Sequence, residues 1–154
     1  MKKVLVIILV FVLGFLANFA LNSVDFSGSL TGADVVSPSD WVEEQQVHVY
    51  RDKVVLDMHD VMFSSFTDTN SMDPLLDAEA NGLEIKPIEG RLKVGDVISY
   101  NSNTYNGVVI HRIIEISSDD SGDYYVVKGD NSLAEDDELV RFDQIEGVLV
   151  GILY

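Results

Sequence analysis

A serine in the run TNSMDP, residues 69–74, is the first candidate for chemistry. Pro74 fixes the backbone shortly after Ser71 and removes one N–H donor, which favours a rigid, exposed turn. A serine hydroxyl becomes a useful nucleophile when a base takes its proton and donors stabilise the oxyanion. A serine among turn formers is more often a turn or cap residue. The candidate therefore needs a base elsewhere in the chain.

His111 is the best-placed base among the three histidines of the chain. It lies inside the apolar run VVIHRII, where strand alternation puts it on one face with Val109 and Ile113. A lone histidine in such a setting is more often a core residue, so other observations must support a catalytic role. His48 and His59 stand among polar residues and are expected at the surface. No HxH or HxxxH spacing occurs, so we predict no metal site and no cofactor.

An acidic run, KGDNSLAED at residues 128–136, follows the strand-like segment YYVV. A carboxylate there could orient the imidazole and stabilise its protonated form, as the aspartate of serine peptidases does. Asp130 and Asp136 are both candidates, and Asp137 is a third if the register of the loop differs by one. A solvated loop is the simpler interpretation. The chain nevertheless supplies serine, histidine and aspartate in that order.

The elements that would position these residues are predicted to be strands. Short β-branched or aromatic segments are separated by clusters of Asn, Ser, Asp and Gly, and no helical stripe of useful length follows residue 21. We therefore expect a mainly β domain from Trp41 to Tyr154, without internal repeats. The expected strands are Val94–Tyr100, Gly107–Ile116, Tyr124–Lys128 and Ile145–Leu153, with a hairpin or bent strand over residues 47–56.

An apolar segment precedes this domain. Val4–Leu21 is 18 residues without a charge, and at ~1.5 Å per residue it spans roughly 27 Å, close to the ~30 Å core of a bilayer. Lys2 and Lys3 directly before it place the N-terminus in the cytoplasm and the domain outside, at the plasma membrane. A cleaved signal peptide is the alternative, but its apolar run is usually shorter. The expected organisation is an anchor over 1–21, a polar spacer over 22–40 and a domain over 41–154.

Composition excludes several classes of protein. The chain has 10 Lys+Arg against 26 Asp+Glu, a net charge of −16, so no basic surface for nucleic acid is expected. It contains no cysteine, which excludes disulfides, thiolate zinc sites and a cysteine nucleophile. Its hydrophobic fraction of 47% is compatible with such acidity only if apolar residues are concentrated in an anchor and a core.

Four segments together resemble the type I signal peptidases, membrane-anchored serine peptidases that remove signal peptides from secreted proteins. They are SMDP at 71–74, VGDVI at 94–98, VIHRI at 109–113 and KGDN at 128–131. Bacterial members commonly carry Lys at the position of His111, whereas archaeal and endoplasmic-reticulum members carry His, so the chain is similar to that branch. The resemblance spans residues 69–151 and includes the single N-terminal anchor.

The resemblance implies a role for each matching residue. Ser71 would be the nucleophile and His111 the general base, while Asp130 matches the aspartate of the GD box and Asp136 a second aspartate of archaeal members. Thr69 stands where many members have a serine whose hydroxyl forms the oxyanion hole with the N–H of the nucleophile. The chain departs from the family where Asn replaces the usual Gly before the serine, and where a longer polar loop is expected over residues 77–91.

The function implied is a membrane-bound serine endopeptidase that cleaves N-terminal signal peptides from preproteins and works at the lipid surface. A histidine that is neutral at pH 7 can accept the serine proton. The substrate is expected to be an extended segment with small residues at the scissile bond, bound as an added strand. Alternatives are a peptidase dedicated to a few surface proteins and an inactive binding module. A Ser/Lys autoprotease is disfavoured because Lys93 and Lys128 do not stand where the base should be.

Overall fold

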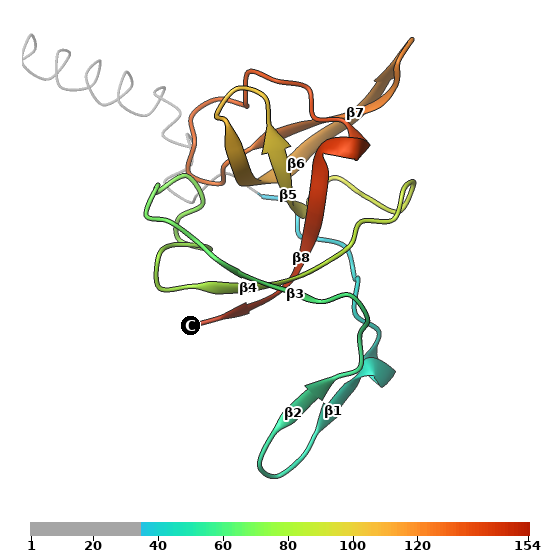
Figure 1. Ribbon diagram of the computed structural model, residues 1–154, viewed down its shortest axis with the longest axis vertical. Coiled ribbons are helices and arrows are strands. Elements are labelled where there is room, and N and C mark those ends of the chain that lie inside the picture. The colour runs from blue at the N-terminus through green and yellow to red at the C-terminus, as the bar shows by residue number, and fades with distance from the viewer. Residues whose placement is uncertain (1–34) are drawn as a thin grey trace, which may run out of the picture. The chain divides into compact units, whose positions relative to one another are not determined.

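Antiparallel strands are the main regular structure of the described chain, residues 35–154 of a computed structural model (Figure 1). Six of them form one sheet in the order β3-β4-β8-β5-β6-β7, and the other two form a separate hairpin. The helices of this part of the chain are two short 3₁₀ segments, η1 (Glu44–Gln46) and η2 (Phe142–Gln144), so the predicted mainly β fold is confirmed. The strands are β1 (Val47–Val49), β2 (Val54–Leu56), β3 (Met62–Ser65), β4 (Asn81–Ile85), β5 (Val97–Ser102), β6 (Gly107–Asp119), β7 (Gly122–Lys128) and β8 (Ile145–Leu153).

The predicted anchor, residues 4–21, and most of the predicted spacer lie outside the described residues. Between residues 35 and 154, none of the helices has the length and apolar character that crossing a membrane requires. The compact unit begins at Val35, and the last residues of the predicted spacer contact it. Ser39 donates from both its backbone N–H and its hydroxyl to the buried carboxylate of Asp96, at 2.7 and 2.6 Å.

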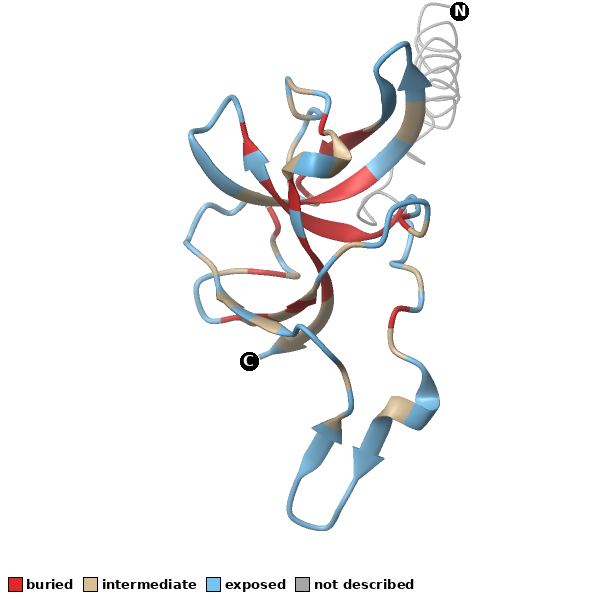
Figure 2. Ribbon diagram, turned by 45° about the vertical axis from the view of Figure 1, so that its right-hand side comes forward, coloured by how far each residue is buried: buried red, intermediate tan, exposed pale blue. Residues whose placement is uncertain are grey.

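Four of the predicted strands are present, three of them with shifted ends. β8 has the predicted bounds, β6 and β7 are longer than expected, and β5 begins three residues later than expected. The later start of β5 follows from a turn, because Gly95 has a φ of +103° and the Asp96 carboxylate accepts a hydrogen bond from the Lys93 N–H at 2.9 Å. The segment over residues 47–56 is a hairpin, whose strands are mostly exposed (Figure 2).

Two strands were not predicted, and one of them corrects the expectation of a polar loop over residues 77–91. β4 lies inside that stretch and pairs with both β3 and β8. Its inward face carries Gly82 and Glu84, so no apolar alternation reveals it in the sequence. A side chain at Gly82 would meet Phe66 at 2.7 Å and Leu149 at 2.9 Å, which explains why a glycine stands in the strand.

β6 lies between two clusters of apolar side chains. Val109 and Ile113 belong to the larger cluster, which includes Tyr100, whereas Ile110 packs with the smaller cluster around Met72. β6 thus joins the main core to the segment between β3 and β4, which carries the candidate serine.

Candidate active site

Ser71 lies in a turn between β3 and β4, held by the apolar residues that follow it. Met72 and Leu76 are 2% and 3% exposed, and the Leu76 N–H donates to the Met72 carbonyl at 3.0 Å. Asn70 has a φ of +57°, a left-handed conformation that asparagine tolerates better than most residues. Asn70 can therefore take the place of glycine there. The Ser71 hydroxyl is 3.2 Å from the Thr69 hydroxyl, which brings these two predicted residues together.

His111 projects from β6 and contacts one of the two candidate aspartates. Its Nδ1 lies 2.7 Å from Oδ2 and 2.9 Å from Oδ1 of Asp136, and its side chain is 9% exposed. Asp136 stands in the loop after β7, where its backbone N–H donates to the Val127 carbonyl at 2.9 Å. A neutral imidazole that donates from Nδ1 carries its lone pair on Nε2. The contact with Asp136 thus leaves Nε2 as a proton acceptor.

Tyr100 is a third member of this network, and nothing in its sequence setting marks it as one. Its side chain is fully buried in β5, and its hydroxyl donates to Oδ2 of Asp136. Burial, together with the hydrogen bond and charge of Asp136, raises the pKa of Tyr100 far above its usual value, so the phenol remains a donor. Tyr100 therefore holds the carboxylate that in turn holds the imidazole.

Asp130, the other candidate, has a different partner. Its two carboxylate oxygens accept hydrogen bonds from Nε and Nη2 of Arg112, both at 2.7 Å. Arg112 also donates to the Gly95 carbonyl at 2.7 Å, and both side chains of the pair are nearly buried. This bidentate pair joins the turn before β5 to the loop after β7. Of the two aspartates that the sequence left open, the structure places Asp136 on His111 and Asp130 on Arg112.

The loop after β7 also holds the serine turn. The backbone N–H of Asn131 donates to the Ser71 carbonyl and its side-chain amide donates to the Asn70 carbonyl, both at 2.9 Å. Gly129 lies where a side chain would not fit, because a Cβ there would be 2.5 Å from the Ser71 carbonyl oxygen and 3.0 Å from Nε2 of His111. The glycine thus permits the loop after β7 to approach both the serine turn and the histidine closely.

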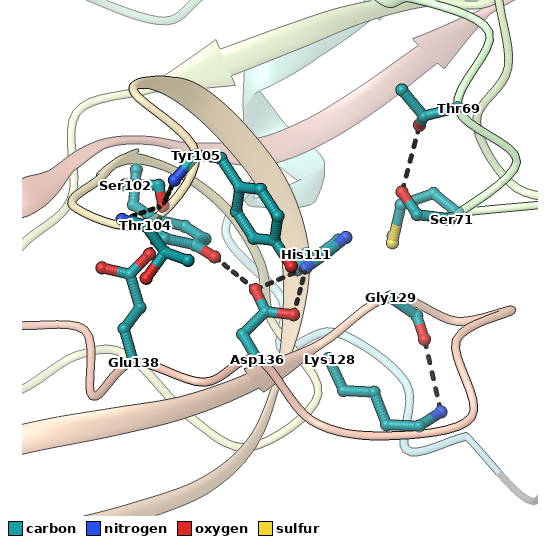
Figure 3. A network of polar contacts seen from close by, with 12 residues as sticks. Thr69, Ser71, Ser102, Thr104, Tyr105, His111, Lys128, Gly129, Asp136 and Glu138 are labelled. Atoms are coloured by element: carbon teal, nitrogen blue, oxygen red, sulfur yellow. Dashed lines mark hydrogen bonds and ion pairs between the residues drawn. The ribbon is translucent and has the colours of Figure 1, made fainter.

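Ser71 and His111 line the same cleft, which has a volume of about 990 Å³. The imidazole edge opposite Asp136 is directed toward the side of the cleft where Ser71 lies (Figure 3). No hydrogen bond joins the serine hydroxyl to the imidazole in this part of the chain, and the hydroxyl pairs with Thr69. Such contacts are often loose without substrate.

No family model, curated protein or solved structure matches this chain. The assignment of a function therefore depends on the residues and their geometry. No three His, Asp or Glu side chains of residues 35–154 converge to bind a metal. His48 and His59 are exposed, as expected. The resemblance to signal peptidases remains a hypothesis from sequence.

One edge of β6 beside the cleft is open. β6 pairs with β7 only from Arg112 onward, whereas residues 107–111 pair with β5 on the other side. Within the described chain, no strand covers the remaining edge of residues 107–111. The backbone groups of this edge can therefore accept an additional extended segment.

Proposed function

We propose that the chain is a membrane-bound serine endopeptidase that removes N-terminal signal peptides from preproteins. The observation that carries the proposal is the arrangement of Ser71 and His111 on one cleft, with Nδ1 of the histidine held by Asp136. The imidazole has its free nitrogen on the side of the serine, which is the arrangement that activates a serine hydroxyl in acyl transfer.

In the first step, Nε2 of His111 takes the proton of the Ser71 hydroxyl while Oγ attacks the carbonyl carbon of the scissile bond. The positive charge on the imidazole is offset by Asp136, 2.7 Å from Nδ1. The tetrahedral intermediate carries its negative charge on the former carbonyl oxygen. The backbone N–H of Ser71 has no acceptor among residues 35–154, so it is free to donate to this oxyanion together with the Thr69 hydroxyl.

In the second step, the C–N bond breaks and His111 returns the proton to the leaving amine. The new N-terminus departs and the signal peptide stays bound to Ser71 as an ester. A water molecule then gives a proton to His111 and attacks the ester carbon. Collapse of the second tetrahedral intermediate returns the proton to Ser71 and releases the carboxylate.

The substrate would bind as an extended segment along the open edge of β6, next to the base. This edge supplies backbone hydrogen bonds without regard to side chains, and the cleft then selects the side chains. The apolar run at residues 4–21, proposed as the anchor, would keep the domain at the membrane in which the hydrophobic part of a signal peptide lies.

Substitution of the two central residues tests the proposal. We expect Ser71→Ala and His111→Ala each to lower cleavage of a preprotein in lipid vesicles by at least about a thousandfold. His48→Ala, at an exposed position of β1, is the control. Circular dichroism would verify that each variant is folded. Full activity of Ser71→Ala would show that the mechanism is wrong.

Two further measurements separate the alternatives. A serine-directed acylating inhibitor should label Ser71, and a folded chain that resists labelling would indicate a binding module. Cleavage of a panel of unrelated preproteins would distinguish a general signal peptidase from one dedicated to a few proteins.

A further inference from the structure

A buried carboxylate lies in the wall of the cleft, separate from the residues that would carry out the reaction. Glu84 of β4 is only 3% exposed, yet it lines the cleft. Its Oε2 accepts a hydrogen bond from the hydroxyl of Ser99, which is 5% exposed and lines the same cleft. Gly147 of β8 leaves room for this carboxylate, because a Cβ there would overlap Oε2 of Glu84.

The second oxygen of Glu84 has no donor among the described residues and is not fully enclosed. No donor to Oε1 is present between residues 35 and 154, and the only fully enclosed side-chain polar atom without a partner in that range is Nε1 of Trp41. Oε1 of Glu84 is therefore unpaired but not enclosed. The three ion pairs of the described residues do not include Glu84; they are His111–Asp136, Arg112–Asp130 and Arg141–Asp119.

A carboxylate removed from water without a cation costs free energy, and an incoming cation would offset this cost. The rest of the cleft favours the same kind of ligand, because its lining contains no lysine or arginine. The acidic residues of the lining are Glu84, Glu135, Asp136, Asp137 and Glu146.

The position of Glu84 suits a side chain of the same peptide that is cut at Ser71. Its hydrogen-bond partner Ser99 is the cross-strand partner of Ile110, the residue before the base. Glu84, Ser99 and residues 108–111 of β6 line the same cleft, so a long side chain of a peptide on β6 would enter the cleft that contains this carboxylate. Met62 lies beside the carboxylate, since its Cε and Oε2 of Glu84 approach the same point near Gly147. Met62 could pack against an aliphatic stem.

We propose that Glu84 and Ser99 form a subsite for a cationic side chain, Lys or Arg, of the peptide substrate. This inference rests on the proposed peptidase function and names a property of its substrates. The cationic residue occupies one fixed position relative to the scissile bond, because an extended peptide presents each side chain at a set distance along the strand. The ammonium or guanidinium group donates to Oε1 of Glu84, and the stem packs on Met62.

Binding to the inactive full-length chain tests the subsite without cleavage. Peptides in which a single Lys is moved along an otherwise neutral sequence would be titrated against Ser71→Ala in detergent, with Met at the same position as the reference. We expect one position at which Lys binds about 10- to 100-fold more tightly than Met, the range expected for a hydrogen bond to a charged group. The double variant Ser71→Ala/Glu84→Gln should lose this preference for the Lys peptide over the Met peptide.

Glu146→Gln in the Ser71→Ala background is the matched control. Glu146 is an exposed acid of the same cleft, so its substitution removes an equal charge without touching the buried pair. Retention of the ratio in this control, with loss in Glu84→Gln, supports a specific subsite. An equal loss in both variants would indicate only the general charge of the cleft and would overturn the inference.

Cleavage by the active chain separates this inference from the proposed function. If the Met peptide is cut and Lys brings no gain in kcat/KM at any position, the peptidase proposal stands and the Glu84 subsite is wrong. If neither peptide nor any preprotein is cut, the peptidase proposal fails. Thermal melting of Glu84→Gln would show that the variant is folded.

Discussion

At the scale of single residues, the two aspartates after β7 are chemically identical and have different roles. Asp136 accepts the hydrogen bonds of an imidazole and a phenol, whereas Asp130 binds a guanidinium through both oxygens. Six positions separate them in the chain. Their partners, and not the residue type, decide which of them can assist a reaction.

Substitution of the two aspartates should therefore separate activity from stability. Asp136→Asn replaces the carboxylate at Nδ1 of His111 with a neutral amide whose NH₂ can donate to Nδ1 and favour the wrong tautomer, so we expect kcat to fall by roughly 10³–10⁴ with a smaller effect on unfolding than Asp130→Asn has. Asp130→Asn leaves the nearly buried Arg112 without its charge partner, so we expect a loss of about 3 kcal/mol of unfolding free energy. Peptide cleavage and urea unfolding of both variants measure the two effects. Equal loss of kcat in the two variants, at equal folded fraction, would contradict the assignment.

At the scale of elements, the loop between β7 and β8 is attached to the end of β5 two residues after Asp136. The carboxylate of Glu138 accepts hydrogen bonds from the Ser102 hydroxyl and, at 3.0 Å, from the Asn103 N–H, both at the end of β5. Ser102 in turn accepts from the Tyr105 N–H at 2.9 Å. The turn between β5 and β6 thereby fixes the segment that carries Asp136.

The contacts of Glu138 predict a dependence of stability on pH. Burial acts to raise the pKa of Glu138, but hydrogen bonds from Ser102 and Asn103 outweigh it and leave the pKa below its usual value. A lowered pKa means that the stabilisation is fully present above about pH 4.3 and is lost as the pH falls through the pKa of the folded state. Glu138→Gln should therefore be less stable than the parent chain at pH 7, and the difference should shrink below about pH 4.

Urea unfolding of both chains at pH 7, 5 and 3.5 would measure this difference. Glu135→Gln is the matched control, because it removes an exposed charge from the same loop without breaking a hydrogen bond between described residues. A difference for Glu138→Gln that stays constant across this range would show that the carboxylate contributes nothing through its ionisation.

At the scale of the whole molecule, the net charge of −16 acts on every element at once. Repulsion among like charges destabilises a compact chain, and salt screens it over a Debye length of about 10 Å at 0.1 M. We expect the thermal midpoint to rise by a few degrees between 0.02 and about 0.5 M NaCl. The same titration near pH 4, where many carboxylates are protonated, should show a smaller rise. A midpoint that falls with salt at pH 7 would mean that attractive pairs outweigh the repulsion.

The sequence by itself determined the mainly β class, most of the strands and the residues worth testing. Val, Ile and Tyr in short runs between turn formers predict β6, β7 and β8, because alternation and turn chemistry are local properties. Residue type and sequence setting also indicate Ser71 and His111 as candidates, because a nucleophile and a base are defined by their side-chain chemistry.

Only the tertiary structure decided what depends on contacts between distant segments. The sequence does not predict β4, because the inward face of this strand carries Gly82 and Glu84 instead of apolar residues. Gly82 packs closely against Phe66, and Glu84 accepts a hydrogen bond from Ser99. The roles of Tyr100, Glu138 and the two aspartates follow from which strand end lies beside which loop. Such contacts join residues tens of positions apart, and no spacing along the chain specifies them, because they depend on how the sheet is ordered in space.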